Sequence, residues 1–264
     1  MRSALVFSIL LGAALLRADT YPRQPGVDAL HYSFALGLSD ANDEIAGTAR
    51  IDLRVTAADL RSVAFDLASV KSGKGMAVAS VSLNENAVEF RHENDRVVIP
   101  VSPAREAGAR IRVEIHYRGV PAGGLRIMKN KFGDRVFFSE NWPNNARHWL
   151  PMIDHPYDKA TSEFAVTAPA HYQVVANGLL QQETDLPGDM RLTGWKQSVP
   201  IASWLNAVGV ARFAVHHAGK VNGVDLQTWV YYQEQHRGPA WFESTSRKAM
   251  EFFSSSIGPY SYEK

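Results

Sequence analysis

Residues 49–55, ARIDLRV, carry the pattern that decides the fold. Their apolar residues alternate with charged ones, which places apolar side chains on one face of an extended chain and charges on the other. The same alternation returns in residues 111–118, IRVEIHYR, and more loosely in residues 32–38, YSFALGL. These three segments predict half-buried antiparallel strands.

Shorter apolar runs continue this β pattern along the chain. They comprise residues 63–67, 78–83, 88–90, 97–101, 164–167, 172–176, 191–195, 202–210, 213–216 and 224–232. Turn-forming pairs such as Asn177-Gly178 and Asn222-Gly223 separate them. Short strands at this spacing predict an all-β fold, an antiparallel β-sandwich. No repeat of fixed period is visible, which disfavours propellers and solenoids.

The last part of the chain has a different period. Five apolar residues follow helical spacing and form one stripe, which ends before Gly258-Pro259: Phe242, Ala249, Met250, Phe253 and Ile257. The sequence therefore predicts one C-terminal amphipathic helix, whose apolar stripe needs a partner. That helix either caps the sandwich or opens a second domain.

Composition limits the classes of function. The 264 residues include 28 Lys and Arg against 27 Asp and Glu, and no long block of like charge occurs. Nucleic-acid binding normally leaves a strong basic patch, so no nucleic-acid partner is expected. The chain has no Cys, which excludes disulfides, a thiolate nucleophile and Cys-ligated metal sites. Any metal must bind His and carboxylate side chains.

The first 18 residues, MRSALVFSILLGAALLRA, are typical of a cleavable signal peptide. Arg2 gives a basic start, residues 4–16 are apolar, and Ala18 ends the segment. The alternative is a membrane anchor, but a spanning helix needs about 20 apolar residues and this run is shorter. We expect an exported protein, periplasmic or secreted, with no membrane span after signal removal.

Common catalytic motifs are missing from the sequence. None of the nine His belongs to a His-Glu-x-x-His pattern, and neither a Gly-x-Ser-x-Gly elbow nor a glycine-rich phosphate loop occurs. The sequence therefore predicts no catalytic residue.

Residues 140–161, ENWPNNARHWLPMIDHPYDKAT, form the most unusual segment. Its prolines and tryptophans indicate an ordered, irregular connection between β units. On the residues alone, Arg147 and Lys159 are expected to pair with Asp154 or Asp158. His148, Asp154 and His155 have metal-ligand chemistry, but their spacing fixes no coordination geometry, so no metal site is expected.

Within this segment, Arg147-x-x-x-Pro151-x-x-Asp154-x-Pro156-x-x-Lys159 resembles the signature in the N-terminal domain of the M1 family of zinc aminopeptidases, relatives of aminopeptidase N and leukotriene A4 hydrolase. Residues 32–36, 46–53, 111–119, 174–178, 200–213 and 253–264 resemble other parts of that family in the same order. The resemblance implies a saddle-like N-terminal β domain over residues 19–235. Residues 236–264 would then be the truncated start of a catalytic domain.

The resemblance also implies a function. Family members bind peptides through a Gly-x-Met-Glu-Asn loop and hold zinc through a His-Glu-x-x-His helix and a later Glu, and this chain contains neither motif. We therefore expect the non-catalytic N-terminal portion of an exported aminopeptidase that removes N-terminal residues from peptides. Zinc is implied for the full-length member and none for this chain, which is expected to be inactive alone. The implied partners are the catalytic domain of the same polypeptide and peptide substrates.

One substrate-binding residue follows from the resemblance. The family's N-terminal domain places an acidic or amide side chain five or seven residues before the signature Arg, where it binds the substrate's free amine. Those positions hold Trp142, which departs from the pattern, and Glu140, whose carboxylate suits an ammonium. The alternative is that Glu140 is a surface residue before a turn.

A different function also remains open on the sequence. The chain would then be a free-standing exported β-sandwich module that binds peptide or carbohydrate. The terminal helix separates the two hypotheses. Exposure of Phe242, Met250 and Phe253 would favour an aminopeptidase fragment, whereas their burial on the sandwich would favour a free-standing module.

Overall fold

The computed structural model describes residue 21 and residues 23–264. The expected signal peptide over residues 1–18 lies outside these described residues. Within them, no helix is long and apolar enough to cross a membrane.

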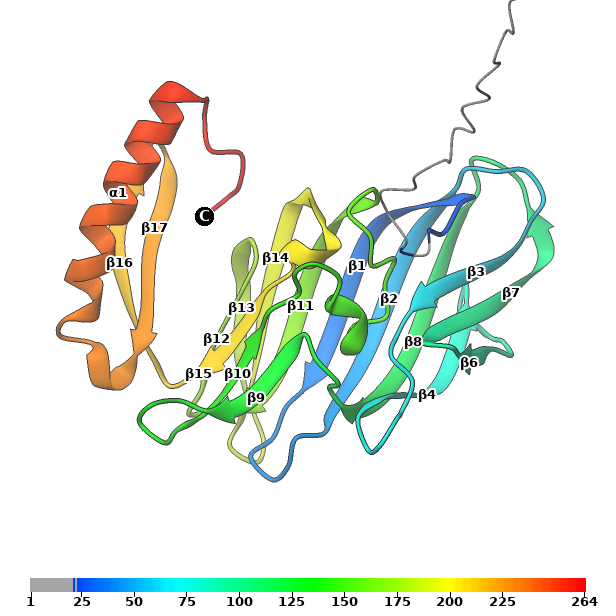
Figure 1. The fold of residues 1–264 in the computed structure, drawn as a ribbon, viewed down its shortest axis with the longest axis horizontal. Helices are drawn as coiled ribbons and strands as arrows, with labels where there is room; N and C mark the ends of the chain where they lie inside the picture. The colour runs from blue at the N-terminus through cyan, green and yellow to red at the C-terminus, as the bar shows by residue number, and fades with distance from the viewer. Residues whose placement is uncertain (1–20, 22) are drawn as a thin grey trace, which may run out of the picture.

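The largest sheet has eight strands in the order β13-β14-β11-β1-β2-β8-β4-β5 (Figure 1). Their bounds are β1 Val27–Gly37, β2 Ile45–Val55, β4 Gly75–Leu83, β5 Asn86–Ala87, β8 Arg110–Val120, β11 Lys159–Pro169, β13 Leu179–Leu186 and β14 Met190–Ala202. All neighbours in this sheet pair antiparallel except β1 and β11, which are parallel.

Three smaller sheets complete the β structure. A four-stranded sheet has the order β12-β15-β10-β9, and a three-stranded sheet has the order β3-β7-β6. The third is the hairpin of β16 and β17. Their bounds are β3 Leu60–Asp66, β6 Arg91–Glu93, β7 Arg96–Arg105, β9 Leu125–Lys129, β10 Arg135–Ser139, β12 Gln173–Ala176, β15 Val208–Ala211, β16 Phe213–Val221 and β17 Val224–Tyr231.

Helical structure is sparse. Three short 3-10 helices interrupt the strands: η1 Ala146–His148, η2 Ser203–Leu205 and η3 Tyr232–Glu234. The α-helix α1 spans Gly238–Ser256, where the sequence predicts it.

Residues 49–55 lie in the centre of the large sheet. They form the second half of β2, in which inward-facing residues are buried and every second residue is at least partly exposed. β2 pairs with β8, which contains the alternating residues 111–118. It also pairs with β1, which contains most of the more loosely alternating residues 32–38. The run at residues 88–90, in contrast, is not a strand. Val88 and Phe90 pack part-buried against the core, and only Asn86–Ala87 pairs with β4.

The hydrophobic core lies between the large sheet and the smaller ones. One continuous cluster joins inward-facing residues such as Phe34 and Ile51 of the large sheet to Phe65 of β3 and Phe137 of β10. In Figure 1, β3 and β7 lie over one half of the large sheet, and β9, β10 and β15 lie over the other. Two layers that share one core make a β-sandwich, as the sequence predicts.

The helix α1 does not join this core. It contacts the hairpin of β16 and β17, and none of its residues is buried. Phe242 and Phe253 are 53% and 54% exposed, and Met250 is partly buried. The helix and its hairpin lie beside the sandwich (Figure 1).

Candidate functional site

The segment that carries the Arg-Pro-Asp-Pro-Lys pattern is the connection from β10 to β11. It contains η1, and its apolar side chains enter the core, where Trp149, Leu150 and Met152 are buried. The backbone of Met152 also exchanges hydrogen bonds with Asp66 at the end of β3. The connection is therefore fixed to both layers of the sandwich.

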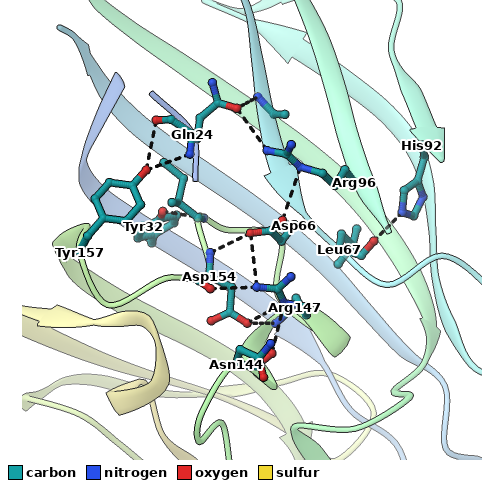
Figure 2. Close-up of polar contacts among 12 residues, drawn as sticks. Gln24, Tyr32, Asp66, Leu67, His92, Arg96, Asn144, Arg147, Asp154 and Tyr157 are labelled. Atoms are coloured by element: carbon teal, nitrogen blue, oxygen red, sulfur yellow. Dashed lines mark hydrogen bonds and ion pairs between the residues drawn. The ribbon is translucent and has the colours of Figure 1, made fainter. Parts of the chain in front are cut away.

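Arg147 and Asp154 form the centre of a buried polar network (Figure 2). The backbone and Nε nitrogens of Arg147 donate to Oδ2 of Asp154, at 3.1 and 3.2 Å. Nη2 of Arg147 donates to the Asp154 carbonyl at 2.9 Å. The hydroxyl of Ser203 donates to Oδ1 of Asp154 at 2.7 Å, which adds η2 to the network. Both carboxylate oxygens of Asp154 therefore accept hydrogen bonds from side chains or backbone within the protein.

Asp66 is the third member of this network. Its Oδ2 accepts the backbone N–H of Asp154 at 3.1 Å, and its carboxylate lies 3.7 Å from Arg147 Nη2 and 3.5 Å from Arg96 Nε. Burial raises the pKa of Asp66, while the two guanidinium groups act in the opposite direction. Arg96 also donates to Oε1 of Gln24, which ties the start of the described chain to the same cluster. The positive charges of Arg96 and Arg147 offset the negative charges of Asp66 and Asp154. The network therefore holds the β10–β11 connection in position.

The other residues of the pattern occupy separate places. Pro151 is buried and Pro156 is exposed. Lys159 is exposed at the start of β11, and no ion pair forms between it and Asp154 or Asp158 in the described structure. Asp158 is buried and accepts the backbone N–H of Ala29 at 3.2 Å. Burial raises the pKa of Asp158 to about 6, and the like charge of Asp28 adds to this effect.

The residues with metal-ligand chemistry do not fit zinc. No three His, Asp or Glu side chains converge as a metal site anywhere in residues 21 and 23–264. Asp154 is committed to Arg147 and Ser203, and Nδ1 of His155 accepts the backbone N–H of Tyr157. Burial and the nearby charge of Arg147 lower the pKa of His148. No position on this segment offers the three convergent donors that a zinc site needs.

Glu140 lies at the surface directly after β10. Its Oε1 accepts the backbone N–H of Trp142 at 3.0 Å, and its Oε2 lies 4.0 Å from Nη2 of Arg126 on β9. The side chain is 41% exposed, so the carboxylate is accessible to solvent. Such a group can pair with an ammonium ion.

Glu140 belongs to an alternating strip that the sequence reasoning missed. Phe138, Glu140 and Trp142 are at least partly exposed, while Ser139 and Asn141 between them are buried. We call these three outward-facing residues the 138–142 strip. The alternation of residues in the sequence could have indicated this strip. The strip is short, however, and extends beyond the end of β10.

A cavity of about 670 Å³ borders the strip at Phe138. It lies between the four-stranded sheet, the β16–β17 hairpin and the chain beyond α1, and most of its lining is apolar or aromatic. The side chains that form its walls include Val208, Phe213, Trp229, Phe242 and Tyr260. Leu205, which follows Trp204 in the sequence, also lines the cavity.

Comparisons with known proteins agree on one family. Residues 28–205 match the family model described as the peptidase M1 N-terminal domain. The glutamyl aminopeptidase of Rattus norvegicus is 27% identical over 116 residues, which is 44% of this chain. Leucine aminopeptidase 2 of Neurospora crassa is 37% identical over 84 residues, 31% of this chain. In both cases the match spans 12% of the relative's own length.

Solved structures share the fold. The M1 zinc metallopeptidase of Deinococcus radiodurans has a TM-score of 0.77 at 23% identity, and the alignment covers 90% of this chain and 55% of that one. A variant of that enzyme bound to the substrate Tyr-Ser-Ala has a TM-score of 0.78 at 22% identity, covering 91% of this chain and 56% of the other. The described chain therefore spans a little over half of that metallopeptidase.

Proposed function

The chain belongs to the M1 family of zinc peptidases through its N-terminal domain, and from this we propose that it acts as the non-catalytic, substrate-facing domain of an exported aminopeptidase. The observation that carries the proposal is the family match across the sandwich, together with a fixed, solvent-facing carboxylate at Glu140. The domain would hold the amino terminus of a peptide while the chemistry occurs elsewhere.

The 264 residues do not supply the chemistry themselves. They contain no His-Glu-x-x-His motif, and the described His and carboxylate side chains do not converge on a metal position. Zinc-dependent hydrolysis needs three protein ligands and an open position for water. We therefore propose that this chain alone does not hydrolyse peptides and that zinc is held by residues outside it.

A catalytic domain is the proposed partner. The exposed aromatic residues of α1 support this, because large apolar side chains exposed together on one element are typical of an interaction surface. Trp241 is 78% exposed, Phe252 62% and Ile257 81%. The hypothesis of a free-standing module predicts that Phe242, Met250 and Phe253 are buried on the sandwich; Phe242 and Phe253 are 53% and 54% exposed, and Met250 is partly buried.

The proposed location is outside the cytoplasm, periplasmic or secreted. The support is the sequence of residues 1–18, with a basic start, an apolar run and a small residue at its end. A core built without Cys is compatible with that location, because a sandwich of this size needs no disulfide bonds.

The role of Glu140 is tested by peptide binding to the 264-residue chain. A tripeptide with a free amino terminus should bind more tightly than its N-acetylated counterpart, because only the ammonium pairs with the carboxylate. Glu140→Gln should reduce this difference about tenfold, the effect expected when a charge-assisted hydrogen bond is lost. Glu89→Gln, at an exposed carboxylate beside β5 at the outer edge of the large sheet, is the matched control. Equal binding of both peptides to the unmodified chain would contradict this role.

Inactivity is tested separately with an aminoacyl-p-nitroanilide and added zinc. We expect no release of nitroaniline above the rate without protein. Turnover that a chelator abolishes would show that the chain assembles a metal centre, against the proposal.

A further inference from the structure

The large sheet turns one face away from the smaller sheets (Figure 1). The register of β11, β1, β2 and β8 places the outward-facing side chains of this face in rows that cross the strands. One row is polar throughout, and the row beside it begins with two alanines. In strand order the first row is Glu163, Ser33, Arg50 and Glu114, and the second is Ala165, Ala35, Thr48 and His116.

Two depressions lie along the second row. One has a volume of about 270 Å³, and its lining includes Ser33, Arg50 and Glu163 of the polar row. The other, of about 550 Å³, extends to Leu192 of β14 and Ala79 of β4. All four residues of the second row line both depressions, which therefore form one groove, called here the outer groove. It crosses six neighbouring strands, a length of about 24 Å at the usual strand spacing.

The charged side chains of the smaller depression are held in place but remain accessible. Oε1 of Glu163 accepts the hydroxyl of Ser33 at 2.6 Å, and the Glu163 side chain is 43% exposed. Nε of Arg50 donates to Oε2 of Glu114, and the Arg50 side chain is 61% exposed. The Nη groups of Arg50 have no hydrogen-bond partner among the described residues. The depression therefore offers a fixed acceptor and free donors.

A third polar group is oriented by a relay. Nε2 of His116 lies 2.7 Å from Oε1 of Glu114, and Nδ1 lies 3.0 Å from the hydroxyl oxygen of Thr48. A carboxylate only accepts, so Nε2 donates to it, and in the neutral ring Nδ1 accepts the Thr48 hydroxyl. The oxygen of Thr48 keeps free lone pairs for a further donor.

The chemistry of the outer groove indicates its class of ligand. The charge of Arg50 is offset by Glu114, so the groove has no strong field to attract a polyanion. Extended peptides commonly bind at a sheet edge, where backbone groups are unpaired, whereas the groove lies on a face whose strands are paired on both sides. Sugar hydroxyl groups both donate and accept, which matches the mixed groups of the smaller depression.

We propose that the outer groove binds a neutral polysaccharide, with one hexose unit in the smaller depression. Glu163 accepts hydrogen bonds from its hydroxyl groups, and the Nη groups of Arg50 donate to them. The methyl groups of Ala35 and Ala165 contact the C–H face of the sugar ring, and the larger depression receives the next units. Glu140 belongs to the other layer of the sandwich, so this site is independent of the proposed peptide binding.

The test is a titration of the 264-residue chain with maltohexaose, cellohexaose and mannohexaose, followed by NMR. At least one of these neutral chains should cause saturable shift changes in β11, β1, β2 and β8. Ala35→Phe fills the floor of the groove and should weaken this binding at least about tenfold, while a phenyl ring on an exposed strand position is compatible with the sheet. Ala87→Phe, at an exposed position of β5 in the same sheet, is the matched control.

A second variant tests the polar contacts without filling the groove. Glu163→Ala should weaken binding about tenfold, as expected when a hydrogen bond to a charged group is lost. Glu183→Ala, which removes an exposed carboxylate from β13 at the edge of the same sheet, should leave it unchanged.

Three outcomes would overturn the proposal. One is the absence of saturable binding by all three oligosaccharides. Another is binding that neither Ala35→Phe nor Glu163→Ala weakens, since the ligand would then lie elsewhere. The third is tighter binding of polygalacturonate that is lost as salt is added, which would show recognition of charge rather than of hydroxyl groups. All three leave the tests of Glu140 unaffected.

Discussion

At the scale of single residues, Asp158 is the group that should make stability depend on pH. Its folded pKa of about 6 lies above the ordinary value near 4, so its stabilising contribution is full below pH 4 and is lost as the pH rises through 6. Asp158→Asn should be about 2 kcal/mol more stable than the unmodified chain at pH 7 and equal to it at pH 4, because an amide oxygen still accepts the Ala29 N–H. Urea unfolding at both pH values measures this. Parallel pH profiles for the two proteins would contradict the assignment.

At the scale of elements, the turn between β12 and β13 depends on Gly178. Its φ is +76°, and a Cβ atom there would lie 1.8 Å from the Lys196 carbonyl oxygen. Gly178→Ala should destabilise the fold by more than about 2 kcal/mol, because backbone strain adds to the clash. Gly188 is the matched control: its φ is +79°, but a Cβ meets nothing, so Gly188→Ala should cost only about 1 kcal/mol. Equal losses in thermal unfolding would show that the clash relaxes.

At the scale of the whole molecule, the hairpin β16–β17 and α1 should open independently of the sandwich. The hairpin adds only Val221, Thr228 and Val230 to the buried residues and meets the core through the part-buried Trp229, and no residue of α1 is buried. Elements with so few buried contacts open more readily than core strands. Amide hydrogens in β16, β17 and α1 should therefore exchange faster than those of β1, β2 and β8. Hydrogen exchange followed by mass spectrometry measures this. Uniform protection would instead indicate a single cooperative unit.

The fold was predictable where one face of a strand is polar. β2 and β8 alternate strictly because the large sheet has a solvated face, and the stripe of α1 marked the helix. β13 was missed because nearly all of its residues are exposed, so it has no alternation. β9 and β10 were missed because they are short. The parallel pairing of β1 with β11 leaves no local pattern in either strand.

The site was predictable only in part. The sequence predicted that Arg147 pairs with Asp154 or Asp158, and the structure places Arg147 in contact with Asp154. It did not mark Asp66, which lies 88 residues before Asp154 and reaches it only through tertiary packing. Trp142 stood out as a departure from a family pattern, but its exposure and its contact with Trp204 depend on the folded connection.

The parallel pairing of β1 with β11 has a consequence for the order of folding. Partners such as His31 and Thr161 are 130 residues apart, so the sheet cannot close at its centre until β11 has been synthesised. Contacts of such long range form slowly because a large loop must be ordered first. Until β11 arrives, a nascent chain that has already paired β1 with β2, and β2 with β8, has an unpaired strand edge at β1. That edge can pair with other chains, and a chaperone that shields it would raise the yield of folded protein.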